Sequence, residues 1–415
     1  MNIVVVNDFA HVNGGVAQVA LSSAQALAER GHRVFLLTAV RAPGQPADAQ
    51  AGRLEIVSTD QQEIAADANR VRAATQGLWN IKAQRVMRSL LERCDPGDTI
   101  IHLHGWTKAL SSSVIREGVR RGYPMITTLH EYFSACPNGG FFNYQTLTSC
   151  PLVPLSAACI CTHCDSRSYP QKLWRVARQV VQHSAGSFPE HTRHFITLSR
   201  FSERILKPYL ASDAVIHPVR NPICVARGKA APIENNSGFI FVGRLSPEKG
   251  GVLMASAAAS LKLPVTFVGN GPMREKIVGT YRSAQMLGWL PGDQVLAELR
   301  RARALVLPSL WYEAQPLVVG EAAALGVPAI VPDDCAASES VIDGVTGLWF
   351  RSGSEEDLRE KMATLHREPG LAARMGAAAF ERYWSDPPTL DRHVDELEIV
   401  YRSVIAESVR QAGFV

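Results

Sequence analysis

The sequence has no apolar run that approaches the roughly 18–20 residues needed for a membrane-spanning helix. No basic segment precedes the short apolar run at the N-terminus, and Asp8 ends that run too early for a signal peptide. The sequence also lacks the period of collagen, the biased composition of a disordered chain and any block of consecutive basic residues. We therefore expect a globular, cytoplasmic protein that does not bind nucleic acid.

Aromatic residues make up only 7% of the chain, but apolar residues as a whole make up 46% of its 415 positions. This length and composition predict two domains, each large enough to bury its own core. The formal net charge of +4 is spread unevenly, because residues 1–222 are basic and residues 223–415 are slightly acidic. The basic half is expected either to face an anionic partner or to carry scattered solvated charges.

One basic segment combines Lys172, Trp174, Arg175 and Arg178. This combination suits peripheral contact with an anionic surface such as the inner membrane face, where lipid-linked acceptors reside. An amphipathic helix that packs into the core has the same pattern. Both interpretations stay open at this point.

The cysteines are clustered, and five of the eight lie between positions 136 and 164. In a cytosolic chain such clustering indicates a metal site before it indicates disulfides. A tetrahedral structural zinc site is expected to use Cys136, Cys150, Cys159 and Cys164, with Cys161 as an alternative ligand. Such a site is closed, so we expect it to take no part in chemistry. Unligated thiols are the main alternative.

Short apolar runs alternate with helical patterns along the whole chain. The first run, Ile3–Val6, is followed by Gly14-Gly15, by a helical pattern over Val16–Arg30 and by a second run at Arg33–Thr38, which is a βαβ unit. Further strands are predicted at 99–103, 124–129, 195–198, 239–242, 265–268, 305–307 and 329–331. The pattern predicts two doubly wound α/β domains.

The domain boundary is predicted between positions 218 and 232, where prolines and polar residues gather and strand signals lapse. Residues 1–222 form the expected first domain, which includes the Cys-rich insert at about 134–168, and we expect that insert to be irregular. Residues 223–385 form the second domain. The amphipathic pattern of Leu390–Val409 predicts a terminal helix within 386–415 that packs back on the first domain.

Five segments of the second half carry short motifs in a fixed order. They are Gly243-Arg244-Leu245-Ser246-Pro247-Glu248-Lys249-Gly250, Gly269-Asn270-Gly271-Pro272, Leu287-Gly288-Trp289-Leu290, the pair Glu313 and Glu321, and Val341-Ile342-Asp343-Gly344-Val345-Thr346-Gly347-Leu348. In this order they resemble the G-R-L-x-x-x-K-G loop, the G-x-G-P turn, the L-G-x-v segment, the E-x₇-E signature and the v-i-x-D-G-x-T-G-l segment of retaining glycosyltransferases of family 4.

The first half adds to this resemblance, since Gly14-Gly15 and Gly31-His32 match the family's opening glycine pattern and His130 occupies the place of its strand-end histidine. The resemblance implies the GT-B fold, with two Rossmann-like domains facing each other across a cleft that holds the active site. The first domain would bind the acceptor and the second the nucleotide-sugar donor. It also implies retaining transfer of a hexose-type sugar to a saccharide or lipid-linked acceptor in polysaccharide or glycoconjugate biosynthesis.

Arg244 and Lys249 are the residues expected to stabilise the leaving diphosphate. Negative charge develops on this group as the glycosidic bond breaks, and fixed cations aimed at it lower the barrier. The two side chains are five positions apart on one Gly-containing loop, so both can reach one diphosphate. With two cations available we expect no catalytic metal, which agrees with the lack of an Asp-x-Asp motif at the matching position.

Glu313 and Glu321 would lie about 80° apart around a single helix. We therefore expect Glu313 on the loop after a strand and Glu321 in the following helix. The resemblance implies that Glu313 contacts sugar hydroxyls and that Glu321 holds the ribose. The family's Gly-Phe-Gly is replaced here by Ala314-Gln315-Pro316, so the identity of the sugar does not carry over. The full donor-binding set is expected to be Gly14, Gly15, Arg244, Lys249, Asn270, Gly271, Leu290, Glu313, Gln315, Pro316, Leu317 and Glu321.

His130, at the end of a predicted strand, is expected to be catalytic together with Arg244, Lys249 and Glu313. His104 and Glu131 are expected on the acceptor side. Retention is expected to follow a front-face route in which the leaving phosphate accepts the acceptor's proton. Two alternatives stay open, namely a GT-B epimerase or phosphorylase, and a zinc-bearing nucleotide-sugar-binding protein without transferase activity.

Overall fold

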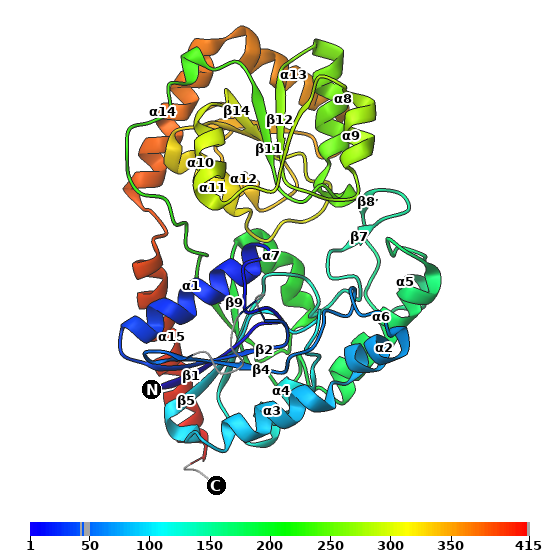
Figure 1. The fold of residues 1–415 in the computed structure, drawn as a ribbon, viewed down its shortest axis with the longest axis vertical. Helices are drawn as coiled ribbons and strands as arrows, with labels where there is room; N and C mark the ends of the chain where they lie inside the picture. The colour runs from blue at the N-terminus through cyan, green and yellow to red at the C-terminus, as the bar shows by residue number, and fades with distance from the viewer. Residues whose placement is uncertain (42–43, 45–49, 413–415) are drawn as a thin grey trace. The chain divides into compact units, whose positions relative to one another are not determined.

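The computed structural model describes residues 1–41, 44 and 50–412, and its chain divides into two compact units (Figure 1). Unit 1 comprises Met1–Gly140, Leu152–Pro222 and Pro388–Val415, and unit 2 comprises Phe141–Pro151 and Ile223–Pro387. From the sequence, the whole Cys-rich segment is expected in the first domain. The structure instead groups Phe141–Pro151 with unit 2.

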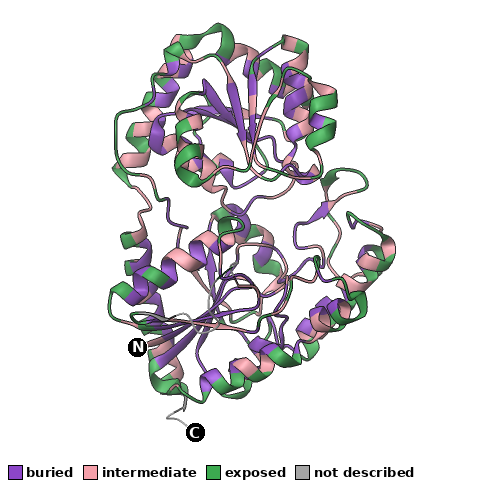
Figure 2. Cartoon of the chain, viewed as in Figure 1, coloured by how far each residue is buried: buried purple, intermediate pink, exposed green. Residues whose placement is uncertain are grey.

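Unit 1 is built on a twisted sheet of eight strands. Its order is β10 (Val215–Pro218), β9 (His194–Thr197), β6 (Met125–Thr128), β5 (Thr99–Leu103), β1 (Asn2–Val6), β2 (Arg33–Thr38), β4 (Leu54–Ser58) and β3 (Gln50–Ala51). All neighbouring strands are parallel except β3 and β4, which pair antiparallel. The middle strands are buried from end to end, which explains why they are continuous apolar runs in the sequence (Figure 2).

Helices surround this sheet (Figure 1). The helices of unit 1 are α1 (Gly15–Glu29), α2 (Arg70–Leu78), α3 (Ile81–Leu91), α4 (Ser113–Arg120), α5 (Ala157–Cys161), α6 (Tyr169–Ser184), α7 (Arg200–Leu206) and α15 (Leu390–Ala412). Several begin at polar caps, such as Asn80, whose side chain accepts a hydrogen bond from the backbone N–H of Ala83 at 3.0 Å. No helix in the described part of the chain is long and apolar enough to cross a membrane.

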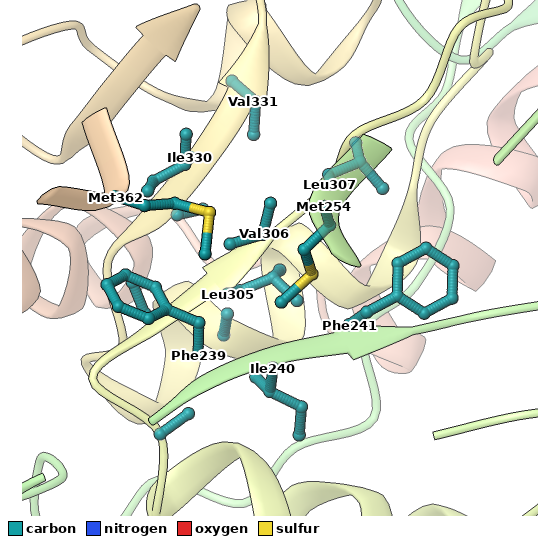
Figure 3. Packing of buried hydrophobic residues seen from close by; sticks show 14 of the residues in the cluster. Phe239, Ile240, Phe241, Met254, Leu305, Val306, Leu307, Ile330, Val331 and Met362 are labelled. Carbon is teal, nitrogen blue, oxygen red and sulfur yellow. The ribbon is translucent and has the colours of Figure 1, made fainter. Parts of the chain in front are cut away.

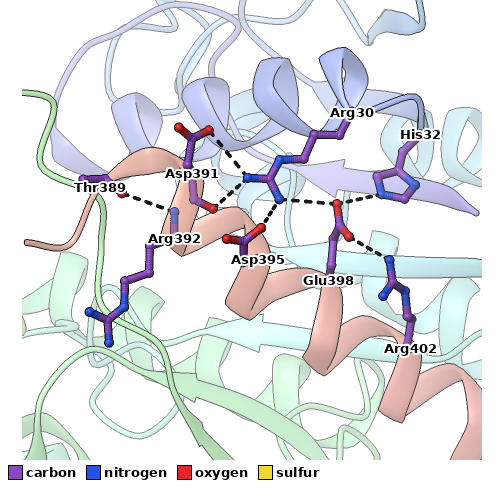
Figure 4. A network of polar contacts seen from close by, with 8 residues as sticks. All are labelled: Arg30, His32, Thr389, Asp391, Arg392, Asp395, Glu398 and Arg402. Atoms are coloured by element: carbon purple, nitrogen blue, oxygen red, sulfur yellow. Dashed lines mark hydrogen bonds and ion pairs between the residues drawn. The ribbon is translucent and has the colours of Figure 1, made fainter.

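The terminal helix α15 belongs to unit 1. It packs against α1 and β5 through its apolar side, on which Val394, Leu397 and Val404 are buried. A polar network joins its outer side to α1, and in this network Arg30 pairs with Asp395 (Figure 4). The network lies at the surface, so the buried apolar contacts supply most of the stabilisation.

Unit 2 holds a second, fully parallel sheet of six strands. Its order is β13 (Gln285–Gly288), β12 (Val265–Val268), β11 (Phe239–Val242), β14 (Ala304–Val306), β15 (Ala329–Pro332) and β16 (Gly347–Phe350). The helices around it are α8 (Gly251–Leu261), α9 (Arg274–Thr280), α10 (Gly292–Arg300), α11 (Leu317–Leu325), α12 (Ala337–Ser340), α13 (Glu355–Arg367) and α14 (Pro369–Ser385). Its core includes Phe239, Met254, Leu305, Ile330 and Met362 (Figure 3).

The strand predictions are confirmed closely. The strands expected at 33–38, 99–103, 239–242 and 265–268 have these bounds in the structure, and the one expected at 305–307 begins and ends one residue earlier. Helical segments separate consecutive strands throughout the unit 2 sheet and across most of the unit 1 sheet, where β3 and β4 follow each other directly. The alternating pattern therefore identified the doubly wound architecture correctly.

The prediction of an irregular Cys-rich segment is wrong in part. Two short antiparallel strands, β7 (Phe142–Asn143) and β8 (Thr148–Ser149), form a hairpin there, and helix α5 follows. The hairpin turn is closed locally, because the Asn143 side chain accepts the backbone N–H of Gln145 at 2.9 Å. Helix α5 begins at Ser156, whose hydroxyl caps the N–H of Cys159. Local polar side chains thus organise a segment that has no apolar period.

Candidate active site

In unit 2 the functional candidates follow the carboxyl ends of adjacent parallel strands. The loop with Arg244 and Lys249 follows β11, the turn with Asn270 follows β12, and Glu313 lies on the loop after β14. These ends meet at the same edge of the sheet, where open α/β sheets bind ligands.

The glycines of this edge let two turns approach each other closely. The backbone N–H of Leu245 donates to the carbonyl of Asn270 at 2.9 Å. A Cβ atom on Gly269 would lie 1.9 Å from the carbonyl oxygen of Gly243, and one on Gly271 would lie 2.3 Å from that of Leu245. Both glycines also have positive φ, so no other residue fits without moving the turns. The motif glycines hold the arginine loop in place.

Lys249 and Glu313 form a buried ion pair. The Lys249 ammonium donates to both carboxylate oxygens of Glu313, at 2.7 and 2.9 Å. The hydroxyl of Ser309 donates to the same carboxylate at 2.6 Å, and Trp311 places its ring 5.0 Å from the ammonium. Glu313 is buried, whereas the Lys249 side chain keeps 23% exposure. The pair therefore presents a partly accessible cation whose position is fixed.

The backbone of Gly250 allows this pair to form. Gly250 has φ 68°, and a Cβ atom there would lie 1.9 Å from the carbonyl oxygen of Pro308. The loop that carries Lys249 can thus pack directly against the loop that carries Glu313.

The carboxyl of Glu313 is ionised at neutral pH. Burial acts to raise its pKa, but the charge and hydrogen bonds of Lys249 and the hydroxyl of Ser309 outweigh burial, so the pKa is lowered from its ordinary value. Arg244 lies on the same loop as Lys249 and is exposed. This edge of the unit 2 sheet thus holds one lysine that is paired with a carboxylate and one exposed arginine.

Glu321 has a different environment. It lies within α11, as expected from its spacing, while Glu313 lies on the preceding loop. Burial raises the pKa of Glu321 to about 7, and its charge contributes to the raised pKa of the Cys224 thiol. Gln315 and Pro316 lie just before α11, and Leu317 is its first residue. Burial alone thus accounts for the raised pKa of Glu321.

In unit 1 the candidates are histidines. The Nδ1 atom of His104, after β5, lies 2.9 Å from the Nε2 atom of His130, after β6. A third ring, that of His102 within β5, lies 4.0 Å from the ring of His104. Glu131, next to His130, is half-buried. The structure thus brings together His104 and His130, for which the sequence predicts separate roles.

All three imidazoles are held neutral. Burial lowers the pKa of His102 and of His104 well below 6.5, and lowers that of His130 to about 3. Gly14 and Gly15 lie at the start of α1, the helix that follows β1, and Gly14 is exposed with no side chain nearby. This edge therefore offers backbone N–H groups and neutral rings.

Asp8, which ends the first apolar run of the sequence, is a further residue of this edge. It is buried after β1, and its carboxylate accepts the backbone N–H groups of Lys108, Ala109 and Leu110 at 2.9, 2.8 and 2.9 Å. Burial raises its pKa, although these hydrogen bonds act in the other direction. Asp8 fixes the loop after β5. An acidic residue directly after a buried strand was the available signal.

The expected zinc site is not found among the described residues, none of whose His, Cys, Asp and Glu side chains form a group of three or more that could hold a metal ion. Cys159 and Cys164 are buried, but the ammonium of Lys172 lies 3.4 Å from the Sγ atom of Cys159, and the side-chain amide of Asn138 donates to Cys164 at 3.1 Å. Of the other cysteines in the cluster, Cys136 is buried, Cys161 is exposed and Cys150 falls in unit 2. Polar hydrogen-bond donors thus stand next to two of the four expected ligands.

The basic segment of α6 faces the protein. Lys172 and Arg178 are buried, Arg175 pairs with Asp165 at 2.6 Å, and the indole of Trp174 donates to the carbonyl of Ala74. The structure therefore supports the interpretation of this segment as a core helix, and its side chains give no support to a membrane contact.

Comparison with known families identifies both halves of the chain. The family described as Glycosyltransferase Family 4 matches residues 13–227, and the family described as Glycosyl transferases group 1 matches residues 226–382. A glycogen synthase of Mycobacterium tuberculosis is 26% identical over 306 residues, which are 68% of this chain and 71% of that protein. A D-inositol 3-phosphate glycosyltransferase of Kribbella flavida is 30% identical over 161 residues, 34% of this chain and 38% of that protein.

Solved structures share the fold. Sucrose-phosphate synthase from Thermosynechococcus elongatus superimposes with a TM-score of 0.71 at 16% identity, over 98% of this chain and 99% of that one. HepE from Anabaena, solved in complex with UDP and glucose, gives a TM-score of 0.64 at 15% identity, over 97% of this chain and 100% of that one. Both units therefore have the Rossmann-like architecture of the GT-B fold.

Proposed function

The chain belongs to glycosyltransferase family 4, and from this premise we propose that it transfers a hexose-type sugar, with retention, from a nucleotide-diphosphate sugar to a saccharide or lipid-linked acceptor. The observation that carries the proposal is the Lys249–Glu313 pair at the carboxyl edge of the unit 2 sheet. A cation held at 2.7 Å by a buried carboxylate cannot swing away, so its orientation is set before the donor arrives. The pair supports a diphosphate site there.

Lys249 and Arg244 have complementary roles in this proposal. Lys249 meets the charge that develops on the leaving diphosphate, and the planar guanidinium of Arg244 binds its oxygens in a bidentate manner. Because Arg244 is exposed and free to adjust, it closes on the diphosphate only when the donor is bound. Two cations at this position support turnover without a catalytic metal.

Glu313 serves two purposes in the proposed site. One is to hold Lys249, and the other is to accept hydrogen bonds from donor-sugar hydroxyls, for which an ionised carboxylate is suited. Glu321 is proposed to hold the ribose hydroxyls. Its raised pKa of about 7 makes its charge, and therefore nucleotide affinity, depend on pH near neutrality.

For the reaction itself we propose the front-face route. The acceptor hydroxyl attacks the anomeric carbon on the face from which the diphosphate leaves, and a leaving phosphate oxygen takes the hydroxyl proton. His130 hydrogen-bonds a sugar oxygen on the unit 1 side, and Glu131 contacts the acceptor. No side chain becomes glycosylated on this route, so isolation of a covalent glycosyl-enzyme by mass spectrometry would overturn it.

A thermal-shift panel tests the donor site. UDP, GDP and ADP and their common sugar conjugates are added to the wild type, to Lys249→Ala and to Lys276→Ala, which removes an exposed lysine of α9 in the same unit. A donor at about 100 times its Kd stabilises the fold by roughly 2.7 kcal/mol. We expect one nucleotide series to shift the wild type and Lys276→Ala but not Lys249→Ala. Because HepE was solved with UDP and glucose, UDP-glucose is the first donor to add. An absence of any shift would favour a protein that no longer binds donors.

A further inference from the structure

His104 and His130, which follow β5 and β6, share a hydrogen bond whose donor and acceptor can be assigned. We propose that His104 is a positioning residue, which donates from Nδ1 to His130 and thereby fixes His130 as the Nδ1–H tautomer, a hydrogen-bond donor toward a sugar oxygen. The role of His130 toward the sugar rests on the proposed function. The tautomer assignment does not, because it follows from the side-chain contacts of unit 1 alone.

The assignment begins at the other nitrogen of His104. Its Nε2 atom is buried and has no hydrogen-bond partner among the described residues. A proton on this nitrogen would be a buried N–H with no acceptor, which costs the full desolvation of the donor. A proton on Nδ1 instead has an acceptor, because Nδ1 lies 2.9 Å from His130 Nε2. The bond is therefore donated by His104 and accepted by His130.

The neutral ring of His130 therefore has one N–H group, whose position is fixed by this bond. Since its Nε2 atom accepts, the neutral ring carries its hydrogen on Nδ1. His130 is half-buried, and in the described part of the chain no other side-chain hydrogen bond to its ring is seen. Its Nδ1–H is thus free to donate to a ligand oxygen at the carboxyl edge of the sheet. An imidazole fixed in this way acts as a donor and not as a general base.

The ring of His104 has two imidazole neighbours. The centroid of the His102 ring lies 4.0 Å away, and both nitrogens of His102 are engaged, Nδ1 with the hydroxyl of Tyr401 at 2.5 Å and Nε2 with that of Thr128 at 2.7 Å. The centroid of the His130 ring lies 5.2 Å away, and the two ring planes differ by 26°. A ring packed in this way cannot flip to exchange its two nitrogens without displacing its neighbours.

Burial keeps the pair neutral, as the assignment requires. The pKa of His104 is well below 6.5 and that of His130 is about 3, so neither ring takes a second proton at neutral pH. The enclosed Nε2 atom also argues against direct contact between His104 and an acceptor, because an atom without accessible surface cannot reach one. The acceptor-side role expected for His104 from the sequence is replaced by a positioning role in this proposal.

The test reads the tautomer directly. Long-range ¹H–¹⁵N spectra of the full chain, labelled at histidine, distinguish Nδ1–H from Nε2–H rings, and His130→Gln identifies the signals of His130. We expect wild-type His130 to be protonated at Nδ1. In His104→Leu, which removes the donor, its proton should move to Nε2 in most molecules. In His104→Asn, whose side-chain amide nitrogen takes the place of Nδ1, the wild-type tautomer should be retained.

Kinetics supply the second readout. His104→Leu should lower kcat/KM for the donor by about tenfold or more, and His104→Asn should recover most of that loss. Tyr401→Phe is the control, because it removes the hydroxyl that hydrogen-bonds Nδ1 of His102 and leaves both partners of the His104–His130 bond in place, so the tautomer should be unchanged.

Two results would overturn the proposal. One is a wild-type His130 protonated at Nε2, and the other is an Nδ1–H tautomer that persists in His104→Leu. If the tautomers behave as expected but no sugar is transferred, the proposed function fails and the assignment of His104 stands. The wild-type spectrum decides the assignment even if a variant does not fold.

Discussion

Units 1 and 2 share one architecture but carry side chains of different chemistry at the carboxyl edges of their sheets. Each places polar side chains after the carboxyl ends of parallel strands, but unit 1 has neutral imidazoles at this edge, whereas unit 2 has a lysine–glutamate ion pair and a half-buried carboxyl. The contrast shows that one architecture can present either hydrogen bonds or charges. It fits a division of labour in which unit 2 stabilises a diphosphate and unit 1 orients uncharged hydroxyls.

The two edges respond to pH in opposite directions. In unit 1 the pKa of His130 falls from 6.5 to about 3 and that of His393 to about 4, so the folded state binds fewer protons than the unfolded state. Their contribution to stability is present above pH 6.5 and is lost as the pH falls through these values. In unit 2 the pKa of Glu321 rises from 4.5 to about 7, so its contribution is present below pH 4.5 and is lost as the pH rises through 7.

The largest expected effect comes from breaking the ion pair of unit 2. Lys249→Ala should lower kcat/KM by about 10²–10³-fold, because the transition state loses a fixed cation. It should also lower the free energy of unfolding by about 2–3 kcal/mol, because Glu313 is left buried without its partner. Steady-state kinetics and urea unfolding measure the two effects. The double variant Lys249→Met/Glu313→Gln should recover stability but not activity, and recovery of activity would contradict the proposed role.

The second effect concerns Glu321, the half-buried carboxyl of the same unit. Glu321→Gln removes a group whose ionisation opposes folding above pH 7, so it should stabilise the protein at pH 8 by about 3 kcal/mol. The gain should shrink as the pH falls and vanish below about pH 4.5, where the wild-type carboxyl is protonated in both the folded and the unfolded state. Nucleotide affinity should fall in the same variant, since Gln cannot replace the carboxylate. Melting curves across pH 4.5–8 check the prediction, and an equal gain at all pH values would refute its cause.

The corresponding pH effect on stability in unit 1 is smaller and runs in the opposite direction, because stability is lost as the pH falls. His393 is buried between the hydroxyl of Ser23 and the carbonyl of Arg220, at 3.0 and 2.9 Å. At pH 5 its depressed pKa should cost the wild type about 2 kcal/mol relative to pH 7. His393→Asn should show a shallower loss of stability between pH 7 and pH 5. An unchanged acid profile would mean that this histidine does not drive it.

The smallest effect is expected away from both edges. Arg30→Ala removes the centre of the network between α1 and α15, whose partners Asp391 and Asp395 are exposed. The loss should stay below about 1 kcal/mol and should shrink further at high salt. Urea unfolding at two salt concentrations measures it. A loss as large as that of Lys249→Ala would mean that the surface pair matters as much as the buried one.

Sequence patterns predicted the sheets well because buried parallel strands need continuous apolar runs, such as Thr99–Leu103 and Phe239–Val242. They did not predict the β7–β8 hairpin, which is closed by the side chain of Asn143 and not by a period of apolar residues. Strands at the margins, such as β10 and β13, are half-exposed and gave no clear run.

The site was predicted as a set of residues but not as a set of contacts. Lys249 and Glu313 were both named, yet their pairing across 64 positions depends on how Gly250 packs against Pro308. The His104–His130 contact could have been inferred, because both follow neighbouring parallel strands. The zinc prediction rested on cysteine spacing, and spacing does not show that Lys172 stands beside Cys159.

The most direct test is to measure the affinity of UDP, which carries the diphosphate without the sugar, by isothermal titration calorimetry for the wild type, Lys249→Ala and His130→Gln. If unit 2 binds the diphosphate and unit 1 only orients the sugar, Lys249→Ala loses UDP binding and His130→Gln retains the wild-type affinity. UDP-glucose should then bind less tightly to His130→Gln than to the wild type. Equal UDP affinity in the wild type and Lys249→Ala, or an equal loss in both variants, would contradict the account.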